Sequence, residues 1–164
     1  MPLKIFSYDR NAVYFYAKEW AYKRNPAFYD FSALGGDCAN YWSQCIFAGA
    51  PKQNYTKTFG WYYNNLNDRS PSFTGVNELY KFLTTNLGVG PFAKPCELKD
   101  VKLGDVVQLG NADGNFYHSP IVTAIINGVV YVSAHSNDVF NKRLSSYGAT
   151  VIRCAHILGY RKYE

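Results

Sequence analysis

Cys38 is the residue of this chain best suited to act as a nucleophile. It lies in the stretch 35–46, which reads GGDCANYWSQCI. Two glycines allow a sharp turn, and Asp37 is a residue type that often precedes the first turn of a helix. A cysteine in that first turn lies near unsatisfied backbone N–H groups and the positive end of the helix dipole, which stabilise a thiolate. We therefore expect Cys38 to be a reactive cysteine near neutral pH.

A second interpretation of Cys38 is a small buried residue in an ordinary helix, the commonest environment of an intracellular cysteine. The Gly-Gly turn and the aspartate directly before Cys38 argue against it, because core packing needs neither feature. Cys45 lies two turns further along the same predicted helix, away from its positive end. For Cys45 we expect core packing and no chemistry.

Three histidines, His118, His135 and His156, are available as the base that a cysteine nucleophile needs. His118 opens a predicted strand beside a loop, where its side chain can project over a helix end, so it is the predicted base. His135 ends the next predicted strand, which follows across the hairpin turn Asn127-Gly128. We expect His135 to lie near His118 and to orient its ring.

Asn137 is a second candidate for the group that orients His118. If the strand through His135 continues, Asn137 points to the same face and Asp138 to the opposite one. His156 lies inside the last predicted strand, and we expect no catalytic role for it. For His118 the competing interpretation, an ordinary surface residue, stays open, since a lone histidine at a strand end is more often a surface residue than a catalyst.

The order of the predicted elements indicates an α+β domain. Periodic apolar residues, caps and stop signals predict helices from Asp9 to 25, from Asp37 to Gly49 and from Thr74 to Gly88. The segment 52–71 is predicted to be a long loop. Alternating patterns and turn signals after Gly90 predict strands over 106–109, 118–126, 129–135 and 149–160. We expect N-terminal helices packed on a C-terminal antiparallel sheet in a single domain, 1–164.

Composition excludes several classes of partner. The chain is 48% hydrophobic and 18% charged with a net charge of +5. Its basic residues are scattered, which gives no support to nucleic-acid binding. It has no apolar run long enough for a membrane, no metal-ligand spacing and no glycine-rich phosphate motif, so we expect no metal, no cofactor and no membrane partner. We expect a monomer.

The first residues, the aromatic content and the remaining cysteines indicate where the protein acts and what it binds. The opening residues lack the apolar core of a signal peptide, so we expect the chain to stay inside the cell or to be an excised piece of a longer protein. Fifteen tyrosines and three tryptophans suit sugar or peptide binding, although aromatic cores have the same composition. If Cys38 is a nucleophile, three cysteines remain and at most one disulfide is possible. Cys96 and Cys154 could form it, and we expect them to stay unpaired.

Four stretches resemble a known family. Residues 35–45 resemble the signature of the bacterial family called "putative amidase domain". Three further pieces match in order, namely YDRNA at 8–12, LGDVVQ at 103–108, and HSPIV at 118–122 with VSAHSND at 132–138. The resemblance covers nearly the whole chain.

This resemblance implies a fold and an activity. The family is similar to the NlpC and CHAP cysteine hydrolases, which implies a papain-like core and cleavage of amide bonds, often in peptidoglycan. Carried over by motif, Cys38 is the nucleophile and His118 the base. The third residue is His135 in the NlpC-like pattern, whereas the CHAP-like pattern places polar residues at His135 and Asn137.

The expected function is therefore a cysteine-dependent amidase or peptidase that acts on a peptide or on peptidoglycan. In that case it acts at the cell wall, outside the cell, as part of a larger or phage-encoded protein. Two alternatives stay open at this point. One is a non-catalytic module that binds glycans or peptides on the same fold, and the other is an acyl transferase that shares the acyl-enzyme step.

Overall fold

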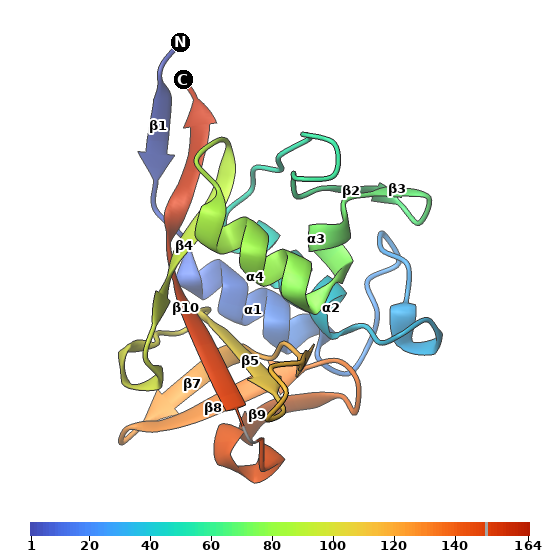
Figure 1. The fold of residues 1–164 in the computed structure, drawn as a ribbon, viewed down its shortest axis with the longest axis vertical. Helices are drawn as coiled ribbons and strands as arrows, with labels where there is room; N and C mark the ends of the chain where they lie inside the picture. The colour runs from blue at the N-terminus through green and yellow to red at the C-terminus, as the bar shows by residue number, and fades with distance from the viewer. Residues whose placement is uncertain (150) are drawn as a thin grey trace.

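The computed structural model shows a mixed α/β fold in which helices pack against a curled antiparallel sheet (Figure 1). It describes residues 1–149 and 151–164. The helices are α1 (Arg10–Trp20), α2 (Cys38–Gly49), α3 (Pro71–Thr74) and α4 (Val76–Thr85). The sheet contains β1 (Leu3–Phe6), β4 (Gly90–Cys96), β5 (Val106–Gly110), β6 (Phe116–His118), β7 (Ile121–Ile126), β8 (Val129–Ala134), β9 (Val139–Arg143) and β10 (Val151–Tyr163).

The strands follow the order β1-β10-β5-β7-β8-β9, with β4 also paired to β10 and β6 to β5. Every pairing within this sheet is antiparallel. Strand β10 is long enough to contact β1, β4 and β5, and it runs the length of the molecule (Figure 1). The sheet is therefore organised around the last strand of the chain.

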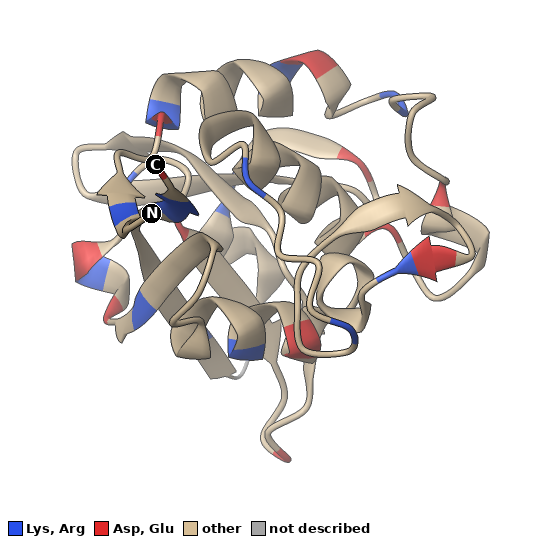
Figure 2. Cartoon of the chain, turned by 90° about the horizontal axis from the view of Figure 1, so that it is seen from above, with Lys and Arg blue, Asp and Glu red and all other residues tan. Residues whose placement is uncertain are grey.

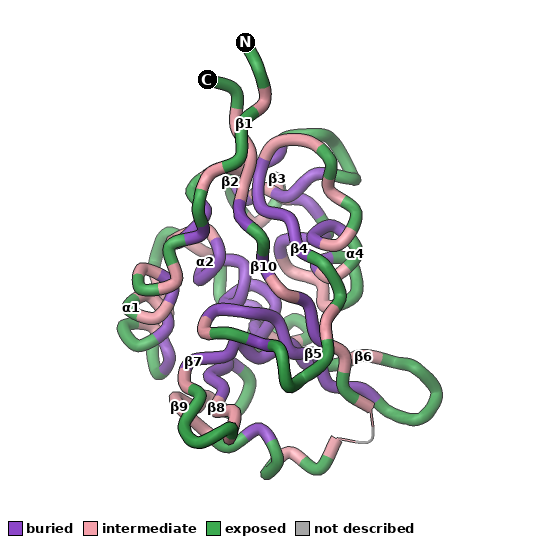
Figure 3. The backbone as a smooth tube through the Cα atoms, turned by 90° about the vertical axis from the view of Figure 1, so that its left-hand side faces the viewer, coloured by how far each residue is buried: buried purple, intermediate pink, exposed green. Residues whose placement is uncertain are grey.

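Both faces of the sheet are covered. In β5, Val106 belongs to the apolar cluster that the helices share, whereas its neighbour Val107 belongs to a second cluster on the opposite face with Leu109 and Val132. Successive strand residues point to opposite faces, so a strand buried on both sides reads as a continuous apolar run. Helix α2 lies in the first cluster and is buried along most of its length (Figure 3).

Helices α1 and α2 follow their sequence signals closely. The Asp9 side chain caps α1 by accepting from the Ala12 N–H at 3.0 Å. At the end of α2, a Cβ added to Gly49 would lie 2.5 Å from the Val13 side chain and 2.6 Å from the Asp9 carbonyl oxygen. Only glycine permits this approach, so Gly49 fixes how closely the Cys38 helix packs against α1.

The predicted hairpin between residues 118–126 and 129–135 is present in part. Ile126 pairs with Val129 across Asn127 and Gly128, whose φ values of 51° and 76° fit a type I′ turn. The predicted strand 118–126 is broken, however, because His118 ends β6 and β7 begins only at Ile121. Pro120 lies in the break and has no N–H to donate to a ladder.

The prediction that all helices precede the sheet was wrong. Strand β1 comes before α1 and pairs with β10, with Leu3 opposite Tyr163. The predicted loop 52–71 contains a separate ribbon of β2 (Tyr63–Asn65) and β3 (Asp68–Arg69). Thr74 does not cap the third helix, since it ends the short α3 and Gly75 separates it from α4. These segments are short, and short strands leave weak periodicity.

Charged residues of both signs are interspersed over the fold (Figure 2). None of the helices within residues 1–149 and 151–164 combines the length and the apolar character needed to cross a bilayer.

Candidate active site

Cys38 is the first residue of α2, as the sequence predicted, and its side chain is buried, with 7% of the residue exposed. Asp37 precedes it but makes no side-chain cap to the helix backbone. The Asp37 carboxylate instead accepts hydrogen bonds from the Phe31 N–H at 2.9 Å and from Asn40 Nδ2 at 3.0 Å. It therefore fixes the turn before the helix to the helix itself.

Burial determines the charge state of Cys38. It raises the pKa of the thiol, and the nearby Asp37 carboxylate raises it further, while hydrogen bonds from the backbone N–H groups of Ser119 and Ala39 lower it. The net pKa is above the ordinary value. Burial thus opposes the thiolate that the position at the helix start favours.

His118 lies in the same region as Cys38. Its ring centroid is 5.4 Å from that of Tyr147, and Cys38 acts electrostatically on the Tyr147 hydroxyl. Burial, aided by the positive charge of Lys142, lowers the pKa of His118 from 6.5 to about 4. Among the described residues, none provides a hydrogen-bond partner for the buried Nε2 atom of His118. The imidazole is therefore neutral at pH 7 and has one ring nitrogen without a hydrogen-bond partner among the described residues.

Lys142 is the cation that faces this histidine from β9. Its Nζ lies 4.1 Å from the centroid of the Tyr147 ring, a cation–π arrangement. Lys142, Tyr147 and His118 thus lie in sequence, with Tyr147 between the other two, in the region of Cys38. A positive charge here disfavours a second one on His118.

Gln108 holds the backbone that contacts the Cys38 sulfur. It is fully buried in β5, and its Nε2 donates to the Ser119 Oγ at 3.1 Å and to the Val76 carbonyl at 2.8 Å. Its Oε1 accepts from Arg153 at 2.6 Å and 2.8 Å. Ser119 is therefore anchored to α4 and β10 through one side chain, and its N–H is held beside the thiol.

His135 directly follows β8 and is buried, but it does not orient His118. Its Nδ1 lies 2.5 Å from the Asp37 Oδ2, and its Nε2 lies 2.7 Å from the Trp20 carbonyl oxygen. The ring stacks on Tyr41, with centroids 4.0 Å apart. Both ring nitrogens are engaged, so the predicted hydrogen bond from His135 to His118 is absent.

The partners of His135 also define its hydrogen-bonding role. A carboxylate oxygen and a carbonyl oxygen are both acceptors. His135 faces both of them, one at each ring nitrogen. It thereby ties the residue before Cys38 to the end of α1.

Asn137 does not share a face with His135. Strand β8 ends at Ala134, and Ser136 and Asn137 have φ values of 70° and 61°. This left-handed backbone turns the chain, and Asn137 is exposed. Asp138 binds Arg24 through two hydrogen bonds of 2.9 Å and 3.0 Å. The prediction of a continuing strand was wrong because it assumed extended backbone at both positions.

The remaining predicted residues lie elsewhere. Cys45 is fully buried in the helix-side core, as expected. His156 lies on β10 and donates from its Nδ1 to the Asp105 Oδ2 at 2.7 Å. Within residues 1–149 and 151–164, no group of three or more His, Cys, Asp or Glu side chains could hold a metal ion.

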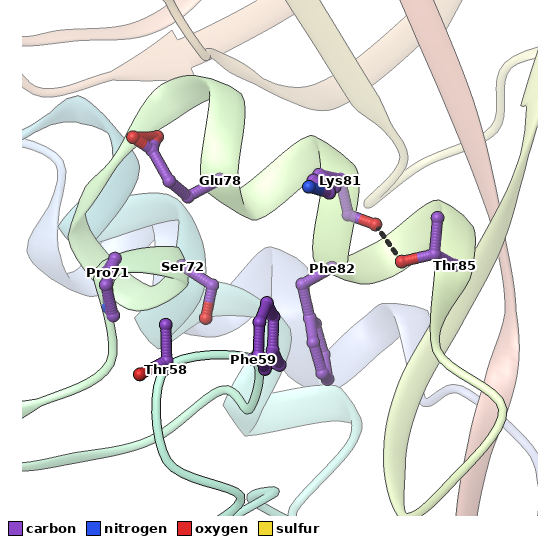
Figure 4. Close-up of a pocket in the computed structure, with 8 residues that line it drawn as sticks. All are labelled: Thr58, Phe59, Pro71, Ser72, Glu78, Lys81, Phe82 and Thr85. Atoms are coloured by element: carbon purple, nitrogen blue, oxygen red, sulfur yellow. Dashed lines mark hydrogen bonds between the residues drawn. The ribbon is translucent and has the colours of Figure 1, made fainter.

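A hollow between the 57–60 turn and α4 contains none of the predicted site residues (Figure 4). Phe59 and Phe82 form apolar surface there, and Phe59 is 76% exposed. Glu78 and Lys81 add charged groups from α4. The hollow offers an apolar contact surface, and neither a cysteine nor a histidine lines it.

Sequence reasoning missed the roles of Lys142, Tyr147 and Gln108. Lys142 and Tyr147 lie in segments without a motif, and the fold alone brings them to the Cys38 region. Gln108 does lie in the stretch 103–108 that carried the family resemblance. A buried amide in an otherwise apolar strand was the signal that could have singled it out.

Comparison with known proteins agrees with part of the sequence analysis. Residues 7–157 match the family described as "Putative amidase domain", a description that suggests amide hydrolysis. The chain is 29% identical over 123 residues to "Uncharacterized protein YhbB" of Bacillus subtilis (strain 168). The alignment covers 74% of this chain and 39% of that protein, so the chain spans about two fifths of the length of this relative. No solved structure matches the chain.

Proposed function

Because the chain belongs to the family described as "Putative amidase domain", we propose that it is a cysteine-dependent amide hydrolase with Cys38 as nucleophile and His118 as base. The observation that carries this proposal is the position of Cys38. Cys38 is the first residue of α2. Its sulfur accepts a hydrogen bond from the Ser119 backbone N–H, and His118 directly precedes Ser119 in the chain. A nucleophile, a base and a hydrogen-bond donor thus come from the start of α2 and from residues 118–119, which meet at the Cys38 sulfur.

The proposed reaction starts from two neutral groups. His118 takes the proton of the Cys38 thiol as the sulfur attacks the amide carbonyl. The negative charge that develops on the carbonyl oxygen lies near the backbone N–H groups at the start of α2. His118 then gives the proton to the departing amine, and a thioester remains on Cys38. Water attacks the thioester, with His118 again as base, and releases the acid.

The wider assignment rests on resemblance. We propose a papain-like arrangement similar to that of the NlpC and CHAP hydrolases, since a helix with the cysteine at its start packs against a sheet that carries the histidine. The substrate proposed from this likeness is a peptide of the bacterial cell wall. In this assignment His135 acts on Asp37 and not on His118.

Mass spectrometry of peptidoglycan fragments tests the function. Incubation with the protein is expected to produce fragments in which one amide bond has gained the elements of water. Acyl transfer to an added amine would instead yield an amide product and would assign the protein as a transferase. Binding of the fragments without any cleavage would support the non-catalytic alternative.

The pH dependence of activity is expected to show the depressed pKa of His118. Its neutral form is the base, so kcat/KM is expected to stay high through pH 6 and to fall only near the folded-state pKa of about 4. Replacing Lys142 by methionine removes a positive charge that lowers this pKa. We expect the acidic limb of the pH–rate profile to move to higher pH in Lys142→Met.

Lys162→Met is the matched control for this shift. Lys162 also lies over an aromatic ring, with its Nζ 4.6 Å from the centroid of Phe6, but it sits on β10 near the chain ends. Its loss is expected to leave the acidic limb unchanged. An acidic limb near pH 6.5 in the unmodified protein, or one that Lys142→Met does not move, contradicts the assignment of His118 as the base.

A further inference from the structure

Cys96 and Cys154 lie opposite each other in the β4–β10 pair. Cys154 belongs to the apolar cluster on the sheet face away from the helices, and Cys96 packs against the same cluster. Both are free thiols. Directly opposed residues of antiparallel strands have Cα atoms about 4.5–5.5 Å apart. Disulfides span Cα separations of about 4.4–6.8 Å, so the register places these two thiols within bonding reach.

The two thiols differ in accessibility. Cys96 is partly exposed and lines a cavity whose other lining residues are Lys94, Pro95, Glu97, Asp100, Lys102 and His156. Cys154 is 3% exposed and does not line the cavity. A small molecule in the cavity therefore reaches the Cys96 thiol, and the buried Cys154 lies opposite Cys96 on the neighbouring strand.

We propose that Cys96 and Cys154 form a thiol–disulfide exchange site for small disulfides such as oxidised glutathione. The Cys96 thiolate attacks one sulfur of the small disulfide, which forms a mixed disulfide and releases one small thiol. The Cys154 thiolate then attacks the Cys96 sulfur and releases the second small thiol. The two protein thiols lose two electrons and their protons, and the small disulfide gains them.

The surrounding charges affect the rate of this exchange. Burial raises the pKa of Cys96, and the carboxylates of Asp105 and Asp100 raise it further, whereas Lys94 lowers it. Burial raises the pKa of Cys154 to about 12, with the nearby Cys96 adding to the effect. Because the thiolate is the attacking form, exchange is expected to accelerate steeply between neutral and alkaline pH.

The test uses the full chain with Cys38→Ala, so that the proposed nucleophile does not react. This variant is incubated with oxidised glutathione at pH ~9, slightly above the ordinary pKa of cysteine. We expect the intact mass to fall by two hydrogens with no glutathione retained. A peptide linking Cys96 to Cys154 is expected after proteolysis without reductant, with Cys45 still a free thiol.

Two further variants in the same background separate the steps. Cys154→Ser is expected to retain one glutathione on Cys96, since the resolving thiol is gone. Cys96→Ser is expected not to react, because Cys154 is buried. A stable glutathione adduct on Cys96 while Cys154 is present overturns the proposal. So does a folded protein that stays fully reduced under conditions in which its urea-unfolded form reacts.

Discussion

Replacing Cys38 by alanine is expected to lower kcat for amide hydrolysis by roughly 10⁴- to 10⁶-fold, the range seen when the nucleophile of a covalent mechanism is removed. No acyl-enzyme can form without the sulfur, and His118 then has no thiol proton to accept. KM for the fragment cleaved by the unmodified protein is expected to change little. The measurement is initial-rate kinetics on that fragment, with circular dichroism to confirm that the variant is folded.

Cys96→Ser serves as the control, because Cys96 is the more accessible thiol and lies on the opposite sheet face from the helices. It is expected to retain full activity. If Cys38→Ala keeps the activity of the unmodified protein, Cys38 is not the nucleophile. If Cys96→Ser is the inactive variant, the chemistry lies in the cavity beside β4.

Asp37→Asn is expected to lower the free energy of unfolding by about 2–3 kcal/mol, because the buried Nδ1 of His135 loses its carboxylate hydrogen-bond partner. The Asp37 and His135 side chains are each 1% exposed, and their contact is 2.5 Å. Replacing the carboxylate by an amide leaves the Nδ1 of His135 without its carboxylate partner. Urea unfolding at pH 7 measures the change.

Asp138→Asn is the matched control for this loss. Asp138 also pairs with a cation, but its side chain and that of Arg24 are 26% and 25% exposed. Exposed pairs contribute at most about 1 kcal/mol. Equal destabilisation by the two variants would mean that Asp37 acts only as an ordinary polar residue of the turn.

A double-mutant cycle isolates the contact itself. The double variant Asp37→Asn/His135→Gln is expected to lose much less free energy of unfolding than the sum of the losses in the two single variants, because both changes remove the same interaction. Additive losses would place the effect of Asp37 in its contacts with Phe31, Asn40 and Arg24 instead.

Local signals in the sequence were sufficient for the elements around Cys38. Helix α2 begins at Cys38 and ends at Gly49 as predicted, and Asn127-Gly128 forms the predicted turn. Each prediction rests on residues adjacent in the chain, whose backbone preferences act locally. The family resemblance also held, since residues 7–157 match the family that the motifs indicated.

The charge and orientation of the site side chains could not be read from the sequence. Helix position predicts a stabilised thiolate at Cys38, but the desolvation that reverses this effect depends on tertiary packing. Strand alternation predicts that the side chains of Asn137 and His135 point to the same face of the sheet. The left-handed backbone at Ser136 and Asn137 ends this alternation. Contacts such as that of His135 with Trp20 join segments more than a hundred residues apart.

Strands β1 and β10 remain paired up to the last residues described, where the Glu164 N–H donates to the Pro2 carbonyl oxygen at 3.2 Å. The two ends therefore lie side by side (Figure 1). A short flexible linker can join them, and new ends can be opened in the exposed loop 111–115. This fold is accordingly suited to circular permutation, which would leave the Cys38 helix and the strand that carries His118 unchanged.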